Sequence, residues 1–136
     1  MANYIANSRT NYFKVTDENE YNNIIKNLIS NSEIEFMKKK IDGEIHYGFA
    51  SYGWFDYKNP KTNEYNFDEF LKKIQKILPD NEVFVYMESG HEKLRYITGL
   101  AIICTNKEIR QMSLQEWILS QTKELTGRDI EDKLNY

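Results

Sequence analysis

The 136-residue chain has little of what holds metals or closes disulfides: it contains 1 cysteine and 2 histidines. A single cysteine, Cys104, cannot form a disulfide within the chain, which is typical of proteins of the reducing cytoplasm. Neither His46 nor His91 has a second histidine or a cysteine at ligand spacing, so we expect no metal site and no cofactor. The 6 glycines are dispersed and none forms a cluster that leads into a helix, so nothing indicates a phosphate-binding loop.

Long apolar runs and an excess of one charge are missing as well. The longest aliphatic run covers residues 100–104, far below the roughly 18 to 20 residues that a membrane span needs. The N-terminal residues lack the apolar block of a secretory signal. The 18 basic and 21 acidic side chains leave a net charge of -3, which argues against a strongly basic nucleic-acid binder. We therefore expect one soluble, cytoplasmic domain over residues 1–136, with neither a membrane nor a nucleic acid as its partner.

Three segments have the apolar periodicity of amphipathic helices. Each opens with Asp, Asn or Ser followed three residues later by Glu, which is the capping-box pattern. The second segment stops before Pro79 and the third ends at Gly127, a residue suited to a helix C-terminus. The expected helices cover residues 17–29, 66–78 and 113–127.

The segments between these helices have strand character. Residues 3–15 are expected to form one long strand, because aromatic and β-branched side chains suit a pleated surface. Asp42-Gly43 separates two alternating runs, 33–40 and 44–52, and predicts a hairpin with a type I′ turn, in which both central residues need a positive φ. A second hairpin is expected from residues 82–88 and 94–105, joined by a polar connection. Its last strand is apolar on both faces and should be central in the sheet.

The expected element order is β-α-β-β-α-β-β-α. It contains the strand-helix-strand-strand-helix-strand order of ferredoxin-like proteins, extended by one strand and one helix. We expect an α+β fold: a largely antiparallel sheet of about five strands with three helices and a ferredoxin-like core. The third helix could cover the second face of the sheet or leave it exposed, and the sequence leaves both arrangements open.

The tip of the second hairpin is the most polar segment of the chain. Residues 88–95 collect two carboxylates, an imidazole and two cations. Glu88, His91 and Glu92 could supply acid/base catalysis, although such a site also needs a cleft that a contiguous turn does not provide. The alternative is a solvated hairpin with local ion pairs.

Aromatic residues make up 14% of the chain, and four of them lie within the six residues 52–57. Alternation along a strand cannot bury Tyr52, Trp54, Phe55 and Tyr57 on one face, so we expect at least one or two of these rings at the surface. Exposed aromatic clusters anchor protein interfaces. The alternative is that Trp54 and Phe55 close the end of the core and Tyr57 covers it.

Two stretches, residues 8–15 and 92–101, resemble a family of small uncharacterised proteins carried by phages, plasmids and conjugative elements of Gram-positive bacteria. The helix between them, residues 67–79, adds to this resemblance. The resemblance implies a mobile-element accessory protein, and such proteins are often inhibitors of host defence, including anti-CRISPR proteins.

We therefore expect a small non-enzymatic protein-binding module that masks a surface of a larger host protein, with a bacterial defence complex as the candidate partner. One alternative is a small enzyme that uses the hairpin tip, and another is a nucleic-acid binder that uses the lysines at 38–40 and on the second helix. A homodimer is also left open. The residues expected to contact the partner are Tyr52, Trp54, Phe55, Tyr57, Glu88, His91 and Glu92.

Overall fold

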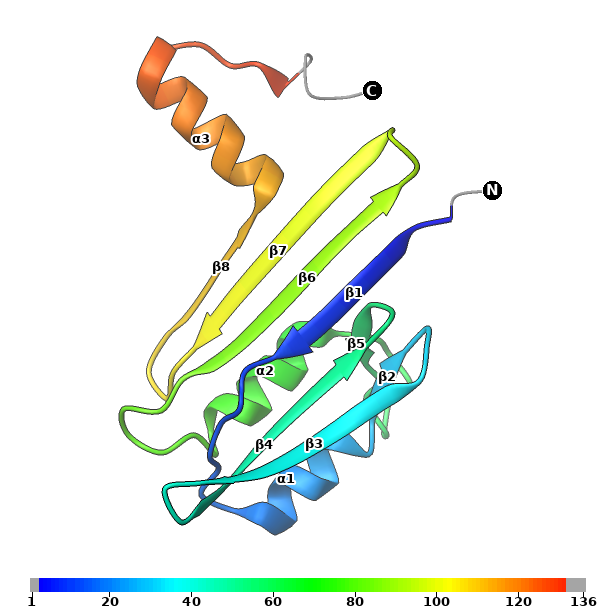
Figure 1. Ribbon diagram of the computed structural model, residues 1–136, viewed down its shortest axis with the longest axis vertical. Coiled ribbons are helices and arrows are strands. Elements are labelled where there is room, and N and C mark those ends of the chain that lie inside the picture. The colour runs from blue at the N-terminus through cyan, green and yellow to red at the C-terminus, as the bar shows by residue number, and fades with distance from the viewer. Residues whose placement is uncertain (1–2, 132–136) are drawn as a thin grey trace.

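The computed structural model describes residues 3–131 and has an α+β fold (Figure 1). The helices within these residues are α1 (Glu18–Ile25), α2 (Phe67–Gln75) and α3 (Leu114–Thr126). The strands are β1 (Ile5–Thr10), β2 (Leu28–Ser30), β3 (Ile34–Ile41), β4 (Glu44–Ser51), β5 (Phe55–Tyr57), β6 (Phe84–Glu92), β7 (Tyr96–Cys104) and β8 (Ile109–Ser113).

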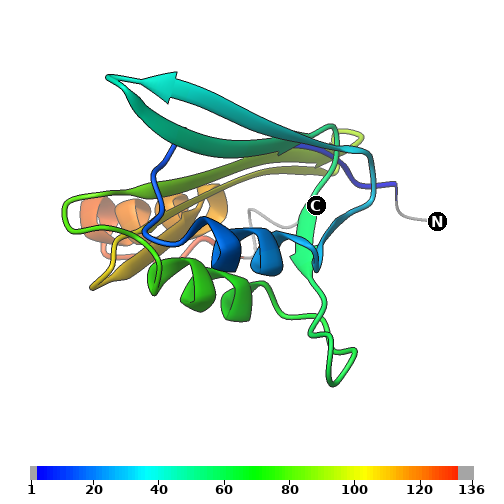
Figure 2. The same ribbon diagram turned by 90° about the horizontal axis from the view of Figure 1, so that it is seen from below.

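The strands form two sheets rather than the single sheet that we expected. Six of them make an antiparallel sheet in the order β3-β4-β1-β6-β7-β8, and β2 pairs with β5 in a separate two-stranded sheet. The prediction of about five strands is wrong because β2, β5 and β8 have only 3, 3 and 5 residues, too few for a readable periodicity. Figure 2 shows that α1 and α2 lie side by side on one face of the larger sheet.

The three predicted helices are present, with the predicted N-caps. The Asp17 side chain accepts the backbone N–H of Glu20 at 3.0 Å, and the Asn66 and Ser113 side chains cap α2 and α3. Gly127 ends α3 in the left-handed conformation, with a φ of 72°. The first helix is shorter than expected, because Leu28 and Ile29 leave the helical stripe and pair with β5 instead.

The first hairpin is confirmed and the second is longer than expected. Asp42 and Gly43 join β3 to β4 with φ values of 51° and 81°, as the type I′ turn requires. In the second hairpin β6 runs on to Glu92, so residues 89–92 are paired strand rather than a connection. The remaining loop is only residues 93–95, and Lys93 makes the turn with a φ of 51°.

The second strand of that hairpin, β7, is not central. It pairs with β6 and β8, but it lies one strand from the edge of the sheet. One face of β7 packs in the core through Ile102 and Cys104, whereas Ile97 and Ile103 on the other face are 66% and 47% exposed. Apolar residues on both faces of β7 therefore did not mean that both faces are buried.

Aromatic rings fill the core between the larger sheet and the two packed helices. Phe13 meets Phe84 edge to face with ring centroids 5.0 Å apart, and Phe49 meets Phe55 at 4.9 Å. Phe70 of α2 packs on the same cluster, 5.8 Å from Phe49. Among residues 3–131, nine aromatic side chains are buried in this core.

A β-bulge interrupts the first segment, which we expected to be one long strand. β1 ends at Thr10, and the chain pairs with β4 again only at Phe13. Inside the bulge the Thr10 hydroxyl accepts the backbone N–H of Phe49 at 3.1 Å. A Cβ atom on Gly48 would lie 3.1 Å from the carbonyl oxygen of Asn11, so the glycine gives the bulged backbone room.

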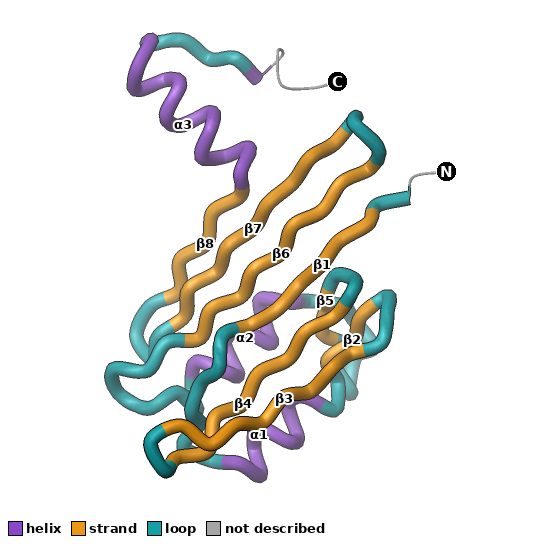
Figure 3. The backbone as a smooth tube through the Cα atoms, in the orientation of Figure 1, coloured by secondary structure: helices purple, strands orange, loops and turns teal. Residues whose placement is uncertain are grey.

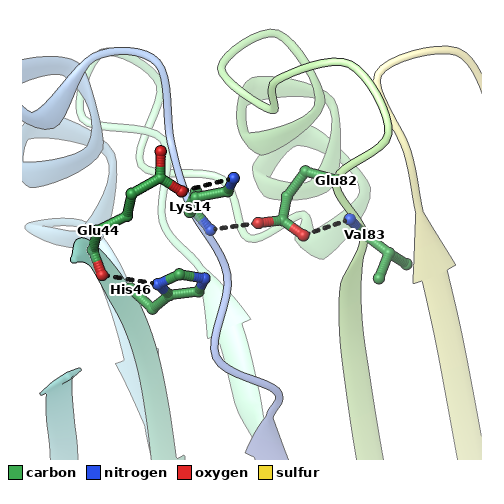
Figure 4. Close-up of polar contacts among 5 residues, drawn as sticks. All are labelled: Lys14, Glu44, His46, Glu82 and Val83. Atoms are coloured by element: carbon green, nitrogen blue, oxygen red, sulfur yellow. Dashed lines mark hydrogen bonds and ion pairs between the residues drawn. The ribbon is translucent and has the colours of Figure 1, made fainter. Parts of the chain in front are cut away.

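Glu82 holds the chain that follows the bulge against the start of β6 (Figure 4). Its two carboxylate oxygens accept the backbone N–H groups of Lys14 at 2.8 Å and of Val83 at 3.0 Å. The Lys14 side chain points the other way and forms an exposed ion pair with Glu44 at 2.9 Å. The two acidic residues next to Lys14 thus differ: Glu82 binds backbone N–H groups, whereas Glu44 binds the lysine side chain.

This difference predicts unequal effects of two substitutions. Glu82→Ala leaves two backbone N–H groups without their acceptor, so the free energy of unfolding should fall by about 1–3 kcal/mol. Glu44→Ala, the matched control, breaks only a solvent-exposed ion pair and should leave the urea midpoint nearly unchanged. Urea unfolding followed by tryptophan fluorescence measures both, and equal losses for the two variants would contradict the assigned role of Glu82.

Candidate functional site

A cleft opens where β1 and β4 separate. The two strands pair only at Ser8–Ser51 and Arg9–Ala50, because β4 ends at Ser51 while β1 extends back to Ile5 beside β6 (Figure 1). The resulting cleft has a volume of about 670 Å³. Its charged lining consists of Arg9, Glu33, Glu35 and Glu88, so carboxylates outnumber cations there.

Hydroxyl groups hold the Glu88 carboxylate in this cleft. Tyr86 donates to one of its oxygens at 2.7 Å and Tyr4 donates to the other at 3.0 Å. Tyr4 also bonds to Thr98 on β7 at 2.8 Å, and the Ser8 hydroxyl lies 3.5 Å from the carboxylate. Burial raises the pKa of Tyr4 and of Tyr86, and the charge of Glu88 raises both further. The carboxylate is therefore a fixed acceptor rather than a freely rotating surface group.

The structure does not bring together the three residues of the predicted polar tip. All three lie in β6, where successive side chains point to opposite faces, so His91 faces away from Glu88 and Glu92. The two carboxylates share a face but are four residues apart, which is about 13 Å along a strand. The exposed His91 instead lines a second hollow of about 620 Å³ together with Ile5 and Ile97. Acid/base chemistry by the three residues together is thus not supported by their positions.

The predicted aromatic surface is mostly core. Phe55 and Tyr57 form the buried side of β5 and are 6% and 2% exposed, so they are not available to a partner. Trp54 is half-buried, and its backbone N–H is held by the Asn31 side chain at 2.8 Å. Only Tyr52 is largely exposed, at 82%, on the rim of the cleft. Contrary to the expected exposure, Phe55 and Tyr57 lie in the core, because β5 turns both rings inward.

The sequence reasoning missed the face of the sheet opposite α1 and α2. Alternate residues of β1, β6, β7 and β8 point to this face, and several are large, apolar and 44–66% exposed. These residues are Ile5, Met87, Ile97, Ile103 and Met112. The alternation of apolar residues in β7 was the available signal, but it does not say whether another element covers them. We call this set of residues the uncovered face.

The uncovered face has a shallow channel across its strands. Asn7, Ser89 and Gly99 are register partners in β1, β6 and β7, and their small side chains form one row. The neighbouring rows contain Met87 on one side and Ile97 on the other, which are larger. Asn7 and Ser89 line both the cleft and the second hollow, so the face is hollowed along this row and a protruding chain can enter it.

The third helix does not pack on the uncovered face. The sequence had left open whether this helix covers the second face of the sheet. α3 extends beyond the end of β8, away from α1 and α2 (Figure 3). Its first residue, Leu114, approaches Gly99, where a Cβ would lie 3.6 Å from the Leu114 Cβ. No residue of α3 is buried.

Comparison of the chain with protein-family models, curated proteins and solved structures finds no match. The resemblance to a mobile-element family therefore stays a prediction. Among residues 3–131, no helix is long and apolar enough to cross a membrane, and no group of three or more His, Cys, Asp or Glu could hold a metal ion.

The tyrosine contacts in the cleft predict a change in alkaline stability. Tyr86→Phe keeps the buried ring but removes a hydroxyl that bonds Glu88, so the free energy of unfolding at neutral pH should fall by about 1–2 kcal/mol. The folded chain holds the Tyr86 proton to higher pH than the unfolded chain does, so ionisation of this group lowers stability as pH rises above about 10.

Without this hydroxyl the decline of stability with pH should become shallower, by an amount that approaches about 1.4 kcal/mol per pH unit as pH rises above about 10. Urea unfolding at several pH values between about 9 and 11 measures the slope. An unchanged slope in Tyr86→Phe would show that the hydroxyl ionises equally in the folded and unfolded chains.

Proposed function

We propose that the chain is a small non-enzymatic protein-binding module and that the uncovered face, together with the adjoining cleft, is its binding surface. The observation that carries the proposal is the set of large apolar side chains exposed on this face. Exposed large apolar side chains gathered on one face commonly mark contact sites.

The composition of the uncovered face supports a protein as the ligand. Met87 and Met112 have flexible side chains that adapt to a partner, while Ile5, Ile97 and Ile103 supply rigid apolar area. Transfer of such area from water is worth about 25 cal/mol per Å². The strands beneath are held by ladder hydrogen bonds, so little ordering cost is added when a partner binds.

The charge around this face favours a basic segment of the partner. Glu33, Glu35 and Glu88 line the cleft beside the uncovered face, with Glu88 on the opposite side of β6 from Met87, and Arg9 is the cation among them. A Lys or Arg side chain entering the cleft would find acceptors already oriented, since Tyr4 and Tyr86 hold the Glu88 carboxylate. Opposite charge at the rim of an interface mainly increases the association rate and the specificity.

The resemblance of residues 8–15 and 92–101 to a mobile-element family extends the proposal. On that basis the partner is a larger host protein, with a bacterial defence complex as the candidate, and binding masks one of its surfaces. The chain then acts by occupying a surface and needs no chemistry of its own.

Substitutions on the uncovered face test the proposal. The immobilised chain first captures a partner from a Gram-positive lysate, mass spectrometry identifies it, and calorimetry with the purified partner gives the Kd. Met87→Glu combined with Ile103→Glu should weaken binding by about 100-fold or more, because two charges would be buried against apolar groups.

The matched control is Phe36→Glu combined with Tyr65→Glu, which adds the same charge at side chains that are 52% and 59% exposed elsewhere. This control should keep the wild-type Kd, and all variants should keep the wild-type circular dichroism spectrum. Unchanged affinity in the Met87 and Ile103 variant would remove the uncovered face as the binding surface.

A further inference from the structure

The third helix has an apolar side that no other element of residues 3–131 covers. Trp117 and Leu125 of α3 are 51% and 83% exposed, and Leu114 at its start is 42% exposed. Helices of 13 residues are marginal in water without tertiary packing, and within residues 3–131 no element buries any residue of α3. The described residues 3–131 therefore leave this side of α3 exposed to solvent, where a second chain could pack against it.

The strand before this helix, β8, is an unprotected sheet edge. An edge strand carries a row of unpaired N–H and C=O groups, and proteins commonly protect such edges with lysines. The opposite edge, β3, has this protection in Lys38, Lys39 and Lys40. β8 has only one cation, Arg110, and Glu108 pairs with it at 3.0 Å. The two edges differ, and β8 is the one left available for strand pairing.

We propose that two copies of this chain associate through β8, which pairs antiparallel with β8 of the second copy across a two-fold axis, and that α3 of each copy packs against the other copy. The two six-stranded sheets then form one continuous sheet. Such an interface is isologous, so the same surface serves both copies. This interface uses the edge of β8 and α3, whereas the binding surface proposed above uses side chains that project from the sheet; Met112 of β8 belongs to both.

A two-fold axis at Gln111 gives the longest pairing of β8 with its copy. With the axis at Gln111, all 5 residues of the strand pair, whereas any other centre leaves part of the strand unpaired. Arg110 then lies opposite Met112 of the second copy, so the two arginines do not face each other. The two Gln111 amides lie opposite one another, and each can donate a hydrogen bond to the other and accept one from it.

The same register places α3 beside the second copy. Ser113 lies opposite Ile109 of that copy, so the helix begins next to the loop that precedes the second β8. Over 13 residues the helix is about 20 Å long, enough to carry Trp117 and Leu125 across the junction.

The composition and charge of this surface permit association between copies. β8 contributes an edge of 5 residues, and α3 contributes the exposed side that carries Leu114, Trp117 and Leu125. The net charge of -3 per chain adds little repulsion between copies.

Sedimentation equilibrium on the full chain tests the association. The wild type should be a dimer at micromolar concentration, and Trp117→Glu combined with Leu125→Glu should weaken dimerisation by about 100-fold or more. Tyr65→Glu, at a side chain 59% exposed outside the interface, is the control and should remain dimeric. A wild type that stays monomeric at about 100 μM would overturn the proposal.

Cysteine cross-linking tests the register, and it does not depend on α3. Residues directly opposite in an antiparallel pair have Cα atoms 4.5–5.5 Å apart, within reach of a disulfide. Gln111→Cys should therefore form a covalent dimer on mild oxidation, while Lys39→Cys on the opposite edge should not; the native Cys104 is buried. A dimer that resists the α3 substitutions and gives no cross-link at position 111 would also overturn the proposal.

Discussion

The pairing of β1 between β4 and β6 is the constraint on which the rest of the structure depends. The buried side of β1 has only small residues, Ala6, Ser8 and Thr10, each at most 4% exposed. Because these side chains are short, Phe49 of β4 and Phe84 of β6 approach each other over β1, with centroids 6.1 Å apart. The core therefore forms across the central strand, and α1 and α2 close it from the same side. Glu82 and the Thr10 bulge hold the chain where it leaves β1.

The helices α1 and α2 cover one face of the larger sheet and leave the other face exposed. The 8- and 9-residue helices α1 and α2 are sufficient for the side that carries the phenylalanine cluster, and α3 extends away from the sheet. The isoleucine and methionine side chains on the second face consequently remain in water, which is unfavourable for a monomer without a partner. The early end of β4 opens the acidic cleft at the border of this face. Both proposals follow from apolar area that the chain does not bury by itself.

The candidate site illustrates why surface function is difficult to read from a sequence. Tyr52, Trp54, Phe55 and Tyr57 are adjacent in the chain, but the pleat and the short strand β5 separate them, leaving Tyr52 at the surface and two rings in the core. Tyr4, which donates a hydrogen bond to Glu88, lies 84 residues away in the sequence, so no local pattern contains this contact. Residues that share a surface are seldom consecutive, because consecutive residues of a strand point to opposite sides.

Local features could be predicted from the amino-acid sequence alone. The N-caps Asp17, Asn66 and Ser113, the Asp42-Gly43 turn and the α+β class depend on interactions within a few residues, so the sequence determined them. Tertiary structure decided which faces are covered, where α3 lies, and how β2, β5 and β8 pair. Short strands take their stability from partners distant in the chain, and burial depends on which elements pack together. Periodicity in one segment carries no information about the element on its other side, so the uncovered face became visible only when the whole sheet was assembled.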